Sequence, residues 1–528
     1  GCNMSDQGLT LGDSDDNATP VEDNISSQSE SVQIRLIHFN DLHAHLTQHK
    51  DRVIKNGKAV VEMRGGIARI ATEVERLKSE SENSILMNIG DTFHGGVEAT
   101  FTNGNAIVDA VNAIGVDIGV MGNWDFAYGP GVSKLRFTDK SVNVLMKKMA
   151  GDVKAVNYPV LAANWFESST FGSSDEPMLP ATKIMIKEGV KIGFIGLTSD
   201  IVERMHAGFA FGSEFTQGEE AYVNLVNTHT QALRQAGCQV VVVMSELGIH
   251  KDKALADLVN QGVDVFFSAH THEVTPTPLT SKSGALVVEA GNDGYLGVMD
   301  LNVNKSGVQK ADWKLVDIDS SITPKAEIVE IVNRERAPFL SNDINMEMPS
   351  MLSGLTLEKS IDTVVGYSQV SLDRRHLFNS TFNTAMTDAL LDASGSELAL
   401  TPGFRFDSII ENEANPLLDA QITIEDLYRL FPSPFTLSTA KISGSDFKSI
   451  YEQMMHVVVS KDAFETNGGW IEGVGGVSAT IDLQGENSHR IKDIRLKSDN
   501  SVIEDDRLYS ITGCSRPLDS SDVLCSYS

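Results

Sequence analysis

The sequence predicts an α/β fold in two domains, and three observations support this. First, 41% of the 528 residues are hydrophobic and 22% are charged, the composition of a folded globular protein. Second, between residues 33 and 320 short apolar runs alternate with segments of helical period, a pattern typical of layered α/β domains. Third, a polar stretch at 321–351 separates this region from a smaller one at 352–528.

The apolar runs of the first region are short and rich in Val, Ile and Leu, as expected for strands buried on both faces. We expect strands at 34–39, 84–89, 116–121, 160–163, 191–197, 240–244, 263–267 and 285–288. The intervening segment 67–77 repeats its apolar residues with a period near 3.6, which indicates a helix with one buried face. Further helices are expected at 106–114, 221–236 and 253–259.

The second region predicts a smaller α+β domain. It holds one helical stretch at 381–393 and strand-like pieces at 437–442, 476–483 and 507–512. A short helical stretch at 326–336 lies inside the polar connector. We therefore expect a tether at 1–32, a first domain at 33–320, a linker at 321–351 and a second domain at 352–528.

The charge balance excludes some classes of partner. The chain has 43 Lys+Arg and 72 Asp+Glu, which gives a net charge of −29. Such a charge repels phosphate backbones and anionic lipid headgroups, so we expect no nucleic-acid polymer as a partner. No apolar run approaches about 18 residues, so no membrane-spanning helix is expected. A small anion bound in a local basic pocket is compatible with this charge.

The N-terminal segment predicts an exported, anchored protein. Residues 1–33 contain seven acids and no Lys or Arg, so they read as a flexible acidic tether. A cysteine at position 2 of such a tether resembles a mature bacterial lipoprotein, which predicts a periplasmic or cell-surface location with a lipid on Cys2. The alternative is that Gly1 is a remnant of cloning and Cys2 an incidental thiol. Cys514 and Cys525 are close enough in sequence to close a small disulfide loop, whereas Cys238 reads as a buried thiol.

Five of the predicted strands run directly into metal-ligating residue types. In open α/β sheets, ligands bind beyond the carboxyl ends of the strands, where such residues gather. One such ending is ordinary turn chemistry, but five together indicate a site. The candidates are Asp41, His43, Asp91, His94, Asn123, Asp125, Glu246, His250, His270 and His272.

The types of these side chains predict a centre with two metal ions. Imidazole nitrogens together with carboxylate and amide oxygens suit Zn, Mn or Fe. The pairs Asp41-x-His43 and His270-x-His272 can each supply two ligands from one turn. Asp91 is the natural bridge, because a carboxylate has two oxygens.

In this order, the motifs resemble those of the calcineurin-like metallophosphoesterases. Phe39-Asn40-Asp41-Leu42-His43 and Gly122-Asn123-Trp124-Asp125 resemble the bacterial 5′-nucleotidase branch. The resemblance covers 34–300, and the second domain resembles that family's substrate-binding domain. It implies a layered metallophosphoesterase sandwich followed by a smaller α+β domain. One metal would take Asp41, His43, Asp91 and His272, and the other Asp91, Asn123, a residue within 246–250 and His270.

Two residues depart from the nucleotidase pattern. Trp124 stands where the nucleotidases carry a histidine that assists phosphoryl transfer, and Glu246 stands where they carry a ligand histidine. Glu246 can still ligate through oxygen, which favours Mn over Zn. His250 is the alternative ligand. His94, beside Asp91, is either a replacement imidazole or a partner of the ligands.

Trp124 also resembles the SoxB thiosulfohydrolase branch of the same superfamily. The segments 372–381, 401–406 and 468–476 of the second domain resemble that branch more than they resemble nucleotidases. Asn123 departs from it, since SoxB has His at that position. The sequence therefore stands between the two activities.

We expect a hydrolase that cleaves a phosphoester, of a nucleotide or a related small anion, by metal-bound hydroxide. A SoxB-like hydrolase that releases sulfate from a sulfur-linked carrier, and a metal-containing binding protein without activity, are the alternatives. The catalytic candidates are Asp91, His94, Asn123, Trp124 and Asp125. Arg405 is the candidate anchor for the anion, because guanidinium matches phosphate and sulfate oxygens. Phe404, Phe406 and Trp470 are candidates for stacking on the substrate.

Overall fold

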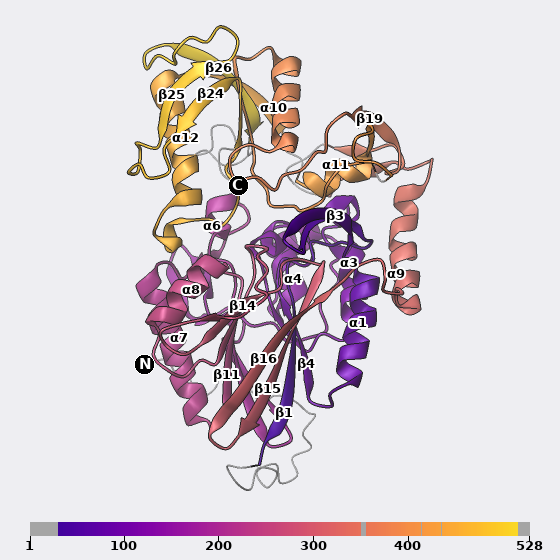
Figure 1. Ribbon diagram of the computed structural model, residues 1–528, viewed down its shortest axis with the longest axis vertical. Coiled ribbons are helices and arrows are strands. Elements are labelled where there is room, and N and C mark those ends of the chain that lie inside the picture. Colours follow the sequence, from indigo (N-terminus) through magenta and orange to yellow (C-terminus); the bar gives the residue numbers. More distant parts are fainter. Residues whose placement is uncertain (1–29, 350–354, 413, 434–435, 516–528) are drawn as a thin grey trace.

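The computed structural model describes residues 30–349, 355–412, 414–433 and 436–515 (Figure 1). The expectations for Cys2, for most of the acidic tether and for Cys525 fall outside these residues. Within them, Cys238 is a buried free thiol, as expected. None of the helices in the described part of the chain is long and apolar enough to cross a membrane.

Two twisted sheets form the centre of the first domain. One has the strand order β16 (Gly307–Asp317), β15 (Tyr295–Asn304), β1 (Val32–Phe39), β4 (Ser84–Ile89) and β5 (Ile118–Val120). The other has the order β13 (Leu279–Thr280), β14 (Leu286–Glu289), β12 (Val265–Ser268), β11 (Val240–Ser245), β9 (Val190–Leu197) and β8 (Thr182–Lys187). Strands β1, β4 and β5 are parallel, as are β9, β11, β12 and β14. Their carboxyl ends therefore share one edge of the sandwich.

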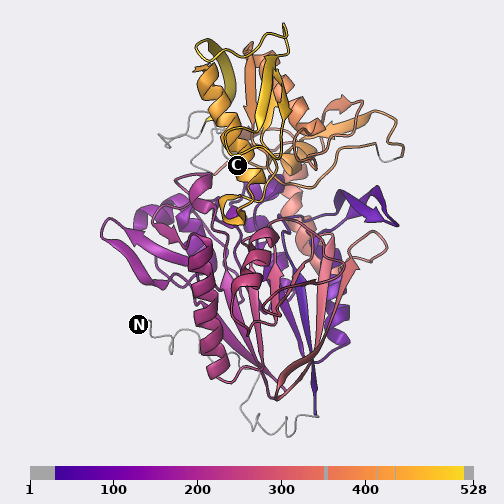
Figure 2. The ribbon, with the colours of Figure 1, turned by 60° about the vertical axis from the view of Figure 1, so that its left-hand side comes forward.

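Helices cover both outer faces of this sandwich (Figures 1 and 2). α1 (Ile67–Ser79) and α3 (Asn105–Ala113) pack on the first sheet, and α7 (Glu219–Gln235) and α8 (Ile249–Leu258) on the second. The apolar side chains between the sheets, such as those of Leu36, Val242 and Phe267, are fully buried. The strands are apolar on both faces for this reason, and the layered α/β fold predicted from the sequence is confirmed.

One predicted strand is wrong. Residues 160–163 are buried but form no strand, and only Val160 makes an isolated bridge, with Gly119 of β5. The next N–H groups donate to carbonyls beside different strands: that of Leu161 to Gly119, and that of Ala163 to Gly196 of β9. The segment thus links β5, the edge strand of the first sheet, to β9 of the second sheet. Its three successive N–H groups have three different partners, since that of Ala162 donates to Pro180, and an apolar run in the sequence cannot reveal this.

Smaller elements of the first domain were not predicted. The hairpin of β2 (His49–Lys55) and β3 (Lys58–Arg64) leaves the edge of the sandwich, and β10 (Ser213–Phe215), β6 (Trp165–Ser169) and β7 (Gly172–Pro177) form a separate sheet. Short helices lie in the loops at the carboxyl ends of the strands: α2 (Gly96–Thr100), η3 (Asn123–Phe126), α4 (Pro130–Phe137), α5 (Val144–Ala150) and α6 (Val202–Met205). These loops build the upper rim of the sandwich.

The second domain sits on this rim (Figure 2). Its main sheet has the order β22 (Thr436–Ser443), β26 (Leu508–Ser515), β20 (Leu398–Thr401) and β23 (Gly473–Gly475). A hairpin of β24 (Val477–Ile481) and β25 (Ile491–Leu496) and the helices α10 (Thr381–Ser394) and α12 (Gly444–Val459) complete it. Its core gathers Leu400, Phe447, Ile494 and Tyr509. The smaller α+β domain is therefore confirmed.

The connector is well structured. α9 (Ala326–Arg336) packs against α1 and α3, and its Ile328 and Val332 belong to the core of the first domain. η4 (Ala337–Leu340) then places Phe339 against Val97 and Phe101 of the rim. The pairs β17 (Met346–Glu347) with β18 (Thr356–Leu357), and β19 (Val364–Ser368) with β21 (Ala420–Thr423), followed by α11 (Ile424–Leu430), lead into the second domain.

The packing of α9 predicts that the connector contributes to the stability of the first domain. Ile328→Ala should lower the free energy of unfolding by about 2–5 kcal/mol, because it leaves a cavity in a closed core. Glu330→Ala, on the exposed face of the same helix, is the control and should change it by less than about 0.5 kcal/mol. Denaturant unfolding measures both. Equal effects would mean that α9 is not part of this core.

Candidate metal centre

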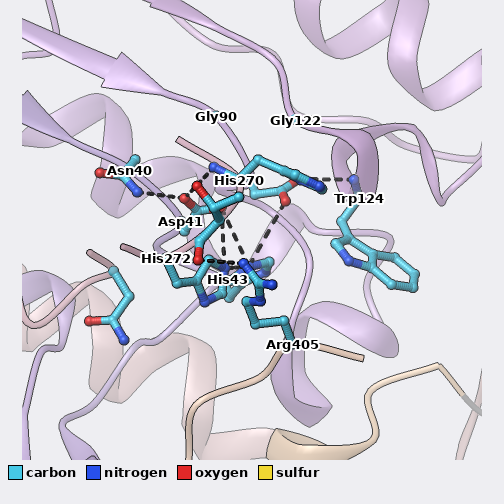
Figure 3. A network of polar contacts seen from close by, with 12 residues as sticks. Asn40, Asp41, His43, Gly90, Gly122, Trp124, His270, His272 and Arg405 are labelled. Atoms are coloured by element: carbon cyan, nitrogen blue, oxygen red, sulfur yellow. Dashed lines mark hydrogen bonds and ion pairs between the residues drawn. The ribbon is translucent and has the colours of Figure 1, made fainter. Parts of the chain in front are cut away.

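The candidate ligands sit on strained loops at the carboxyl ends of the strands (Figure 3). Five of them have a positive φ, a left-handed conformation that costs a non-glycine residue roughly 1–3 kcal/mol: Asp41 (54°), His43 (46°), Asp91 (50°), His270 (78°) and His272 (52°). The loops after β1 and β4 hold each other in place, since the N–H groups of Asp41 and His43 donate to the carbonyls of Gly90 and Asp91 at 2.9 Å. Such a concentration of strain is typical of functional sites.

The first cluster consists of Asp41, His43 and His272. The Nε2 atoms of the two histidines lie 3.2 Å apart, and Asp41 Oδ1 lies 3.8 Å from His43 Nε2 and 3.4 Å from His272 Nε2. Asp91 Oδ2 is 4.0 Å from His43 Nε2. None of the four side chains is more than 4% exposed.

The second cluster consists of Asp91, Glu246 and His270. Nδ1 of His270 lies 3.6 Å from Glu246 Oε1 and 3.0 Å from Asn123 Oδ1. Asp91 is close to both clusters, as a bridging ligand requires. His250 belongs to neither cluster and packs instead against Gly468, where a Cβ would lie 3.0 Å from its ring.

The hydrogen bonds of the histidines test whether metal ions fit here. Nδ1 of His43 donates to the carbonyl of His94 (3.0 Å), and Nδ1 of His272 donates to Asp407 (2.6 Å). In neutral rings each Nε2 therefore carries a lone pair, and the two lone pairs face each other across 3.2 Å. They repel unless a cation, either a proton on His272 or a metal ion, lies between them. Metal-binding histidines use their second nitrogen in this manner.

The carboxylates give the same result. Oδ1 of Asp41 and both carboxylate oxygens of Glu246 are buried without a hydrogen-bond partner in the described structure. Burial, reinforced by the charge of Asp41, raises the pKa of Asp91 and Glu246 well above the usual range. Although burial opposes it, Asp407 and Asp41 raise the pKa of His272 to about 10. The site thus has an excess of buried negative charge, and the residues present fit two divalent cations.

Asp125 holds the ligand loops from behind. Its carboxylate accepts the backbone N–H groups of Gly122 (2.8 Å), Asp91 (3.0 Å), Thr92 (3.1 Å) and Phe93 (3.0 Å). It therefore fixes the loop that presents Asp91 and faces away from the clusters. Gly122 is required beside it, because a Cβ there would lie 2.0 Å from Asp91 Oδ1.

Trp124 contacts the site in two ways. Its backbone N–H donates to Asp91 Oδ1 at 2.9 Å, and its indole stacks on the ring of His94 with centroids 4.6 Å apart. His94 also lies 3.1 Å from Ser433 Oγ through Nε2, and burial lowers its pKa to about 3. Phe404 and Phe406 pack against the same indole and are themselves buried. The four rings form one aromatic wall.

The second domain completes the ligand environment, through residues that the sequence did not single out. Asp407 accepts the hydrogen bond of His272 and is held by Arg375 at 3.1 Å and by Asn292 at 2.8 Å. The carbonyl of Asn467 lies 2.6 Å from His270 Nε2. Asp407 directly follows the quoted segment 401–406, but its contact with His272 spans 135 residues and has no local signal.

A pocket opens between the domains at this point. Its wall includes His43, Asp91, Asn123, Trp124, His270, His272, Phe404, Arg405 and Gly468. Arg405 donates to the carbonyl of Thr271, its guanidinium lies 4.5 Å above the ring of Trp470, and its Nε has no partner in the described structure. A half-buried cation with a free donor beside two carboxylate-rich clusters can orient an anionic substrate.

The fold is a layered α/β sandwich followed by a smaller α+β domain. Residues 34–274 match the calcineurin-like phosphoesterase family, and residues 361–515 match the 5′-nucleotidase C-terminal domain. The chain thus combines a calcineurin-like phosphoesterase domain with a 5′-nucleotidase C-terminal domain, and the resemblance seen in the sequence is confirmed.

Curated relatives are similar over nearly the whole chain. The trifunctional nucleotide phosphoesterase protein YfkN of Bacillus subtilis is 24% identical over 92% of this chain and 31% of its own length. A probable 5′-nucleotidase of Treponema pallidum is 23% identical over 82% of this chain and 77% of its own. The chain thus spans about a third of the length of the first relative.

Two solved structures share the fold. The sulfate thiohydrolase SoxB of Thermus thermophilus superposes with a TM-score of 0.75 at 18% identity, covering 93% of this chain and 92% of its own. A 5′-nucleotidase precursor from the same organism gives 0.71 at 20% identity, covering 91% and 89%. Both of the branches that the sequence resembles are therefore structural neighbours.

The contacts of Asp125 predict that its loss weakens metal binding. Asp125→Ala should lower the free energy of unfolding by more than about 3 kcal/mol, since each buried N–H left unpaired costs roughly 1–3 kcal/mol. Metal content should fall with it, because the loop carrying Asp91 loses its anchor. Asp125→Asn, which keeps one acceptor, should give a smaller loss.

Asp117 supplies the control for this prediction. Its carboxylate accepts the N–H of Leu86 (2.7 Å) at the opposite end of the same strands. Asp117→Ala should cost stability while leaving metal content unchanged. Elemental analysis and denaturant unfolding measure both quantities, and a normal metal content in Asp125→Ala would contradict the anchoring role.

Proposed function

We propose that this chain is a dinuclear metal-dependent hydrolase that cleaves a phosphoester of a small anionic molecule, of the nucleotide class. One observation carries the proposal: two clusters of metal ligands meet at Asp91 and open onto a pocket lined by Arg405. Similarity to YfkN, a trifunctional nucleotide phosphoesterase, supports the substrate class. The substrate is expected to enter between the two domains.

The ligands for the two ions follow from the clusters. Asp41, His43 and His272 would hold one, His270, Glu246 and Asn123 the other, and Asp91 would bridge them. Oxygen donors outnumber imidazoles at the second ion, which favours Mn, with Zn and Fe as alternatives. When bound, such ions neutralise charge on the attacked group and activate a water as nucleophile at neutral pH.

The protein's own residues bind and orient the substrate. Arg405 directs its guanidinium at the anionic group, and Trp470 beneath it limits the positions that the guanidinium can take. Phe404 and Trp124 close one side of the pocket and exclude water from it. Asp407 and Asn467 fix the rings of His272 and His270. The orientation of these two candidate ligands therefore depends on the second domain being closed on the first.

Trp124 affects how the leaving group of the substrate can be protonated. An indole N–H can donate a hydrogen bond but does not exchange a proton near neutral pH. His94, the nearby imidazole, is covered by the indole and engaged with Ser433. Among the described residues, the aromatic wall therefore offers no free imidazole as a proton donor for a poor alkoxide leaving group. We expect a preference for substrates with acidic leaving groups, such as nitrophenolates or thiols.

A second candidate function follows from the same feature. A thiol leaves with a pKa of about 8.5 and needs little protonation, so a SoxB-like release of sulfate from a sulfur-linked carrier also suits Trp124. Retention of Asn123 as a partner of His270 favours the phosphoesterase. A metal-containing binding protein without activity is the third possibility, motivated by Trp124 and Glu246.

Cellular location belongs to the proposal as well. We expect the protein in the periplasm or on the cell surface, anchored by a lipid on Cys2. The acidic, Lys- and Arg-free character of residues 1–33 supports this. Mass analysis of membrane-fraction protein for an acyl-modified Cys2 tests it.

A substrate panel tests the proposed activity. Purified protein with added Mn²⁺ should hydrolyse members of a set of nucleotides, cyclic nucleotides, a p-nitrophenyl phosphodiester and S-thiosulfonates. Asp91→Asn should lower kcat/KM at least about 100-fold, or about 2.7 kcal/mol of lost transition-state stabilisation. Asp117→Asn, a carboxylate outside the site, is the control.

Each result of this panel selects one candidate. Turnover of S-thiosulfonates alone would favour the SoxB-like activity. No turnover with two metals bound would support the binding protein, and fewer than one bound transition metal with no gain on adding Mn²⁺ would reject the dinuclear proposal altogether.

Replacing Trp124 should change substrate preference. Trp124→His supplies an ionisable donor beside Asn123. Hydrolysis of adenosine monophosphate should therefore improve relative to that of a nitrophenyl ester by about 10- to 100-fold. A well-placed general acid contributes roughly 10²–10⁴-fold, and an introduced one should reach at most the lower end of that range. The ratio of the two kcat/KM values, at matched metal content, is the measurement. Trp124→Phe keeps an aromatic ring that has no ionisable proton, and it should leave the ratio unchanged. An equal ratio in all three proteins would exclude control by this position.

A further inference from the structure

A third cluster of metal-ligating residues lies outside the site described above. It consists of His45 in the loop after β1, His49 at the start of β2 and Asp293 in the turn between β14 and β15. One potential ligand atom from each lies within 4.8 Å of the others. His49 and Asp293 are fully buried, and the side chain of His45 is 9% exposed.

The hydrogen bonds of His49 leave one nitrogen directed at the carboxylate. Its Nδ1 donates to the carbonyl of Lys50 at 3.1 Å. Its Nε2 lies 2.9 and 3.1 Å from the two oxygens of Asp293. In a neutral ring this Nε2 carries a lone pair, so a cation, either a proton or a metal ion, must lie between the nitrogen and the carboxylate.

His45 favours the metal ion over the proton. Its Nδ1 lies 3.3 Å from Asp293 Oδ2 but forms no hydrogen bond, and it is buried without a partner in the described structure. Its ring stacks on that of His49 with centroids 3.9 Å apart, so both rings approach the same carboxylate. A proton shared by His49 and Asp293 leaves His45 unsatisfied, whereas a metal ion satisfies all three residues.

The spacing and the charge suit a small tetrahedral ion. Nitrogen and oxygen ligands at about 2.0–2.2 Å from Zn²⁺ are separated by about 3.3 Å from each other in a tetrahedron. The observed separations of 2.9 to 3.3 Å from Asp293 agree with this. The charged groups beside the cluster are themselves paired, Arg429 with Glu425 and Asp51 with Arg375, so the charge of Asp293 is left to attract a cation.

We propose that His45, His49 and Asp293 bind a third divalent cation, of the Zn²⁺ class, with a structural role. Two imidazoles and one carboxylate form a ligand set that Zn²⁺ prefers. Asp293 also accepts the N–H of Gly66 at 3.0 Å, and a Cβ at Gly65 would lie 1.9 Å from it. The ion would therefore join three loops, one of which begins with the candidate ligands Asp41 and His43.

Metal stoichiometry of the full chain tests this proposal. Protein saturated with Zn²⁺ and then dialysed should retain one equivalent more than the dinuclear centre holds. His49→Gln should lose one equivalent, whereas Asp91→Asn should lose metal from the dinuclear centre and keep the third ion. A lower metal content in both variants supports both sites. A lower metal content in His49→Gln alone supports the third site and rejects the dinuclear centre.

A second measurement covers a His49→Gln variant that fails to fold. Metal-depleted Asp91→Asn protein, in which His45, His49 and Asp293 are intact, is titrated with Zn²⁺ by equilibrium dialysis. One tightly bound equivalent that Asp293→Asn in the same background removes supports the site. No tight equivalent, or an unchanged metal content in folded His49→Gln, would overturn it and leave a proton between His49 and Asp293.

Discussion

The burial of several carboxylates at one edge of a sheet is the constraint on which the rest of the structure depends. Asp41, Asp91 and Glu246 meet there, and Oδ1 of Asp41 and both carboxylate oxygens of Glu246 have no hydrogen-bond partner in the described structure, so bound cations would stabilise the folded state at that point. The left-handed loops, the N–H groups gathered by Asp125 and the glycine at position 122 all keep these side chains together. The candidate metal centre therefore depends on the backbone of the first domain.

The second domain is part of this centre as well as a cover for it. His272 and His270 each direct one nitrogen at the metal clusters and the other at the second domain, where Asp407 and Asn467 accept. A movement of that domain would change the orientation of both rings, because each ring is held by one of these two hydrogen bonds. Arg405 lines the pocket from the same segment as Asp407.

The sequence could predict the features that are local. Strands buried on both faces are continuous apolar runs, and the candidate ligands follow them directly, so Asp41, Asp91 and His270 could be singled out by their position. Contacts between distant residues have no such signal, which is why Asp407 and the cluster at Asp293 were missed. The strand predicted at 160–163 was wrong for a related reason, because burial alone does not decide whether a segment pairs as a strand.

The two roles of position 124 suggest how this fold can change substrates. The backbone N–H of Trp124 holds Asp91, and any residue except proline supplies that bond. The side chain packs in the aromatic wall with His94, Phe404 and Phe406, and it lines the pocket. Because the two roles use different atoms, the side chain can vary while the support of Asp91 persists. Under the proposed function, a substitution at this position would therefore change the surroundings of the leaving group without removing the support of Asp91, which explains how a tryptophan is accommodated beside the candidate ligands.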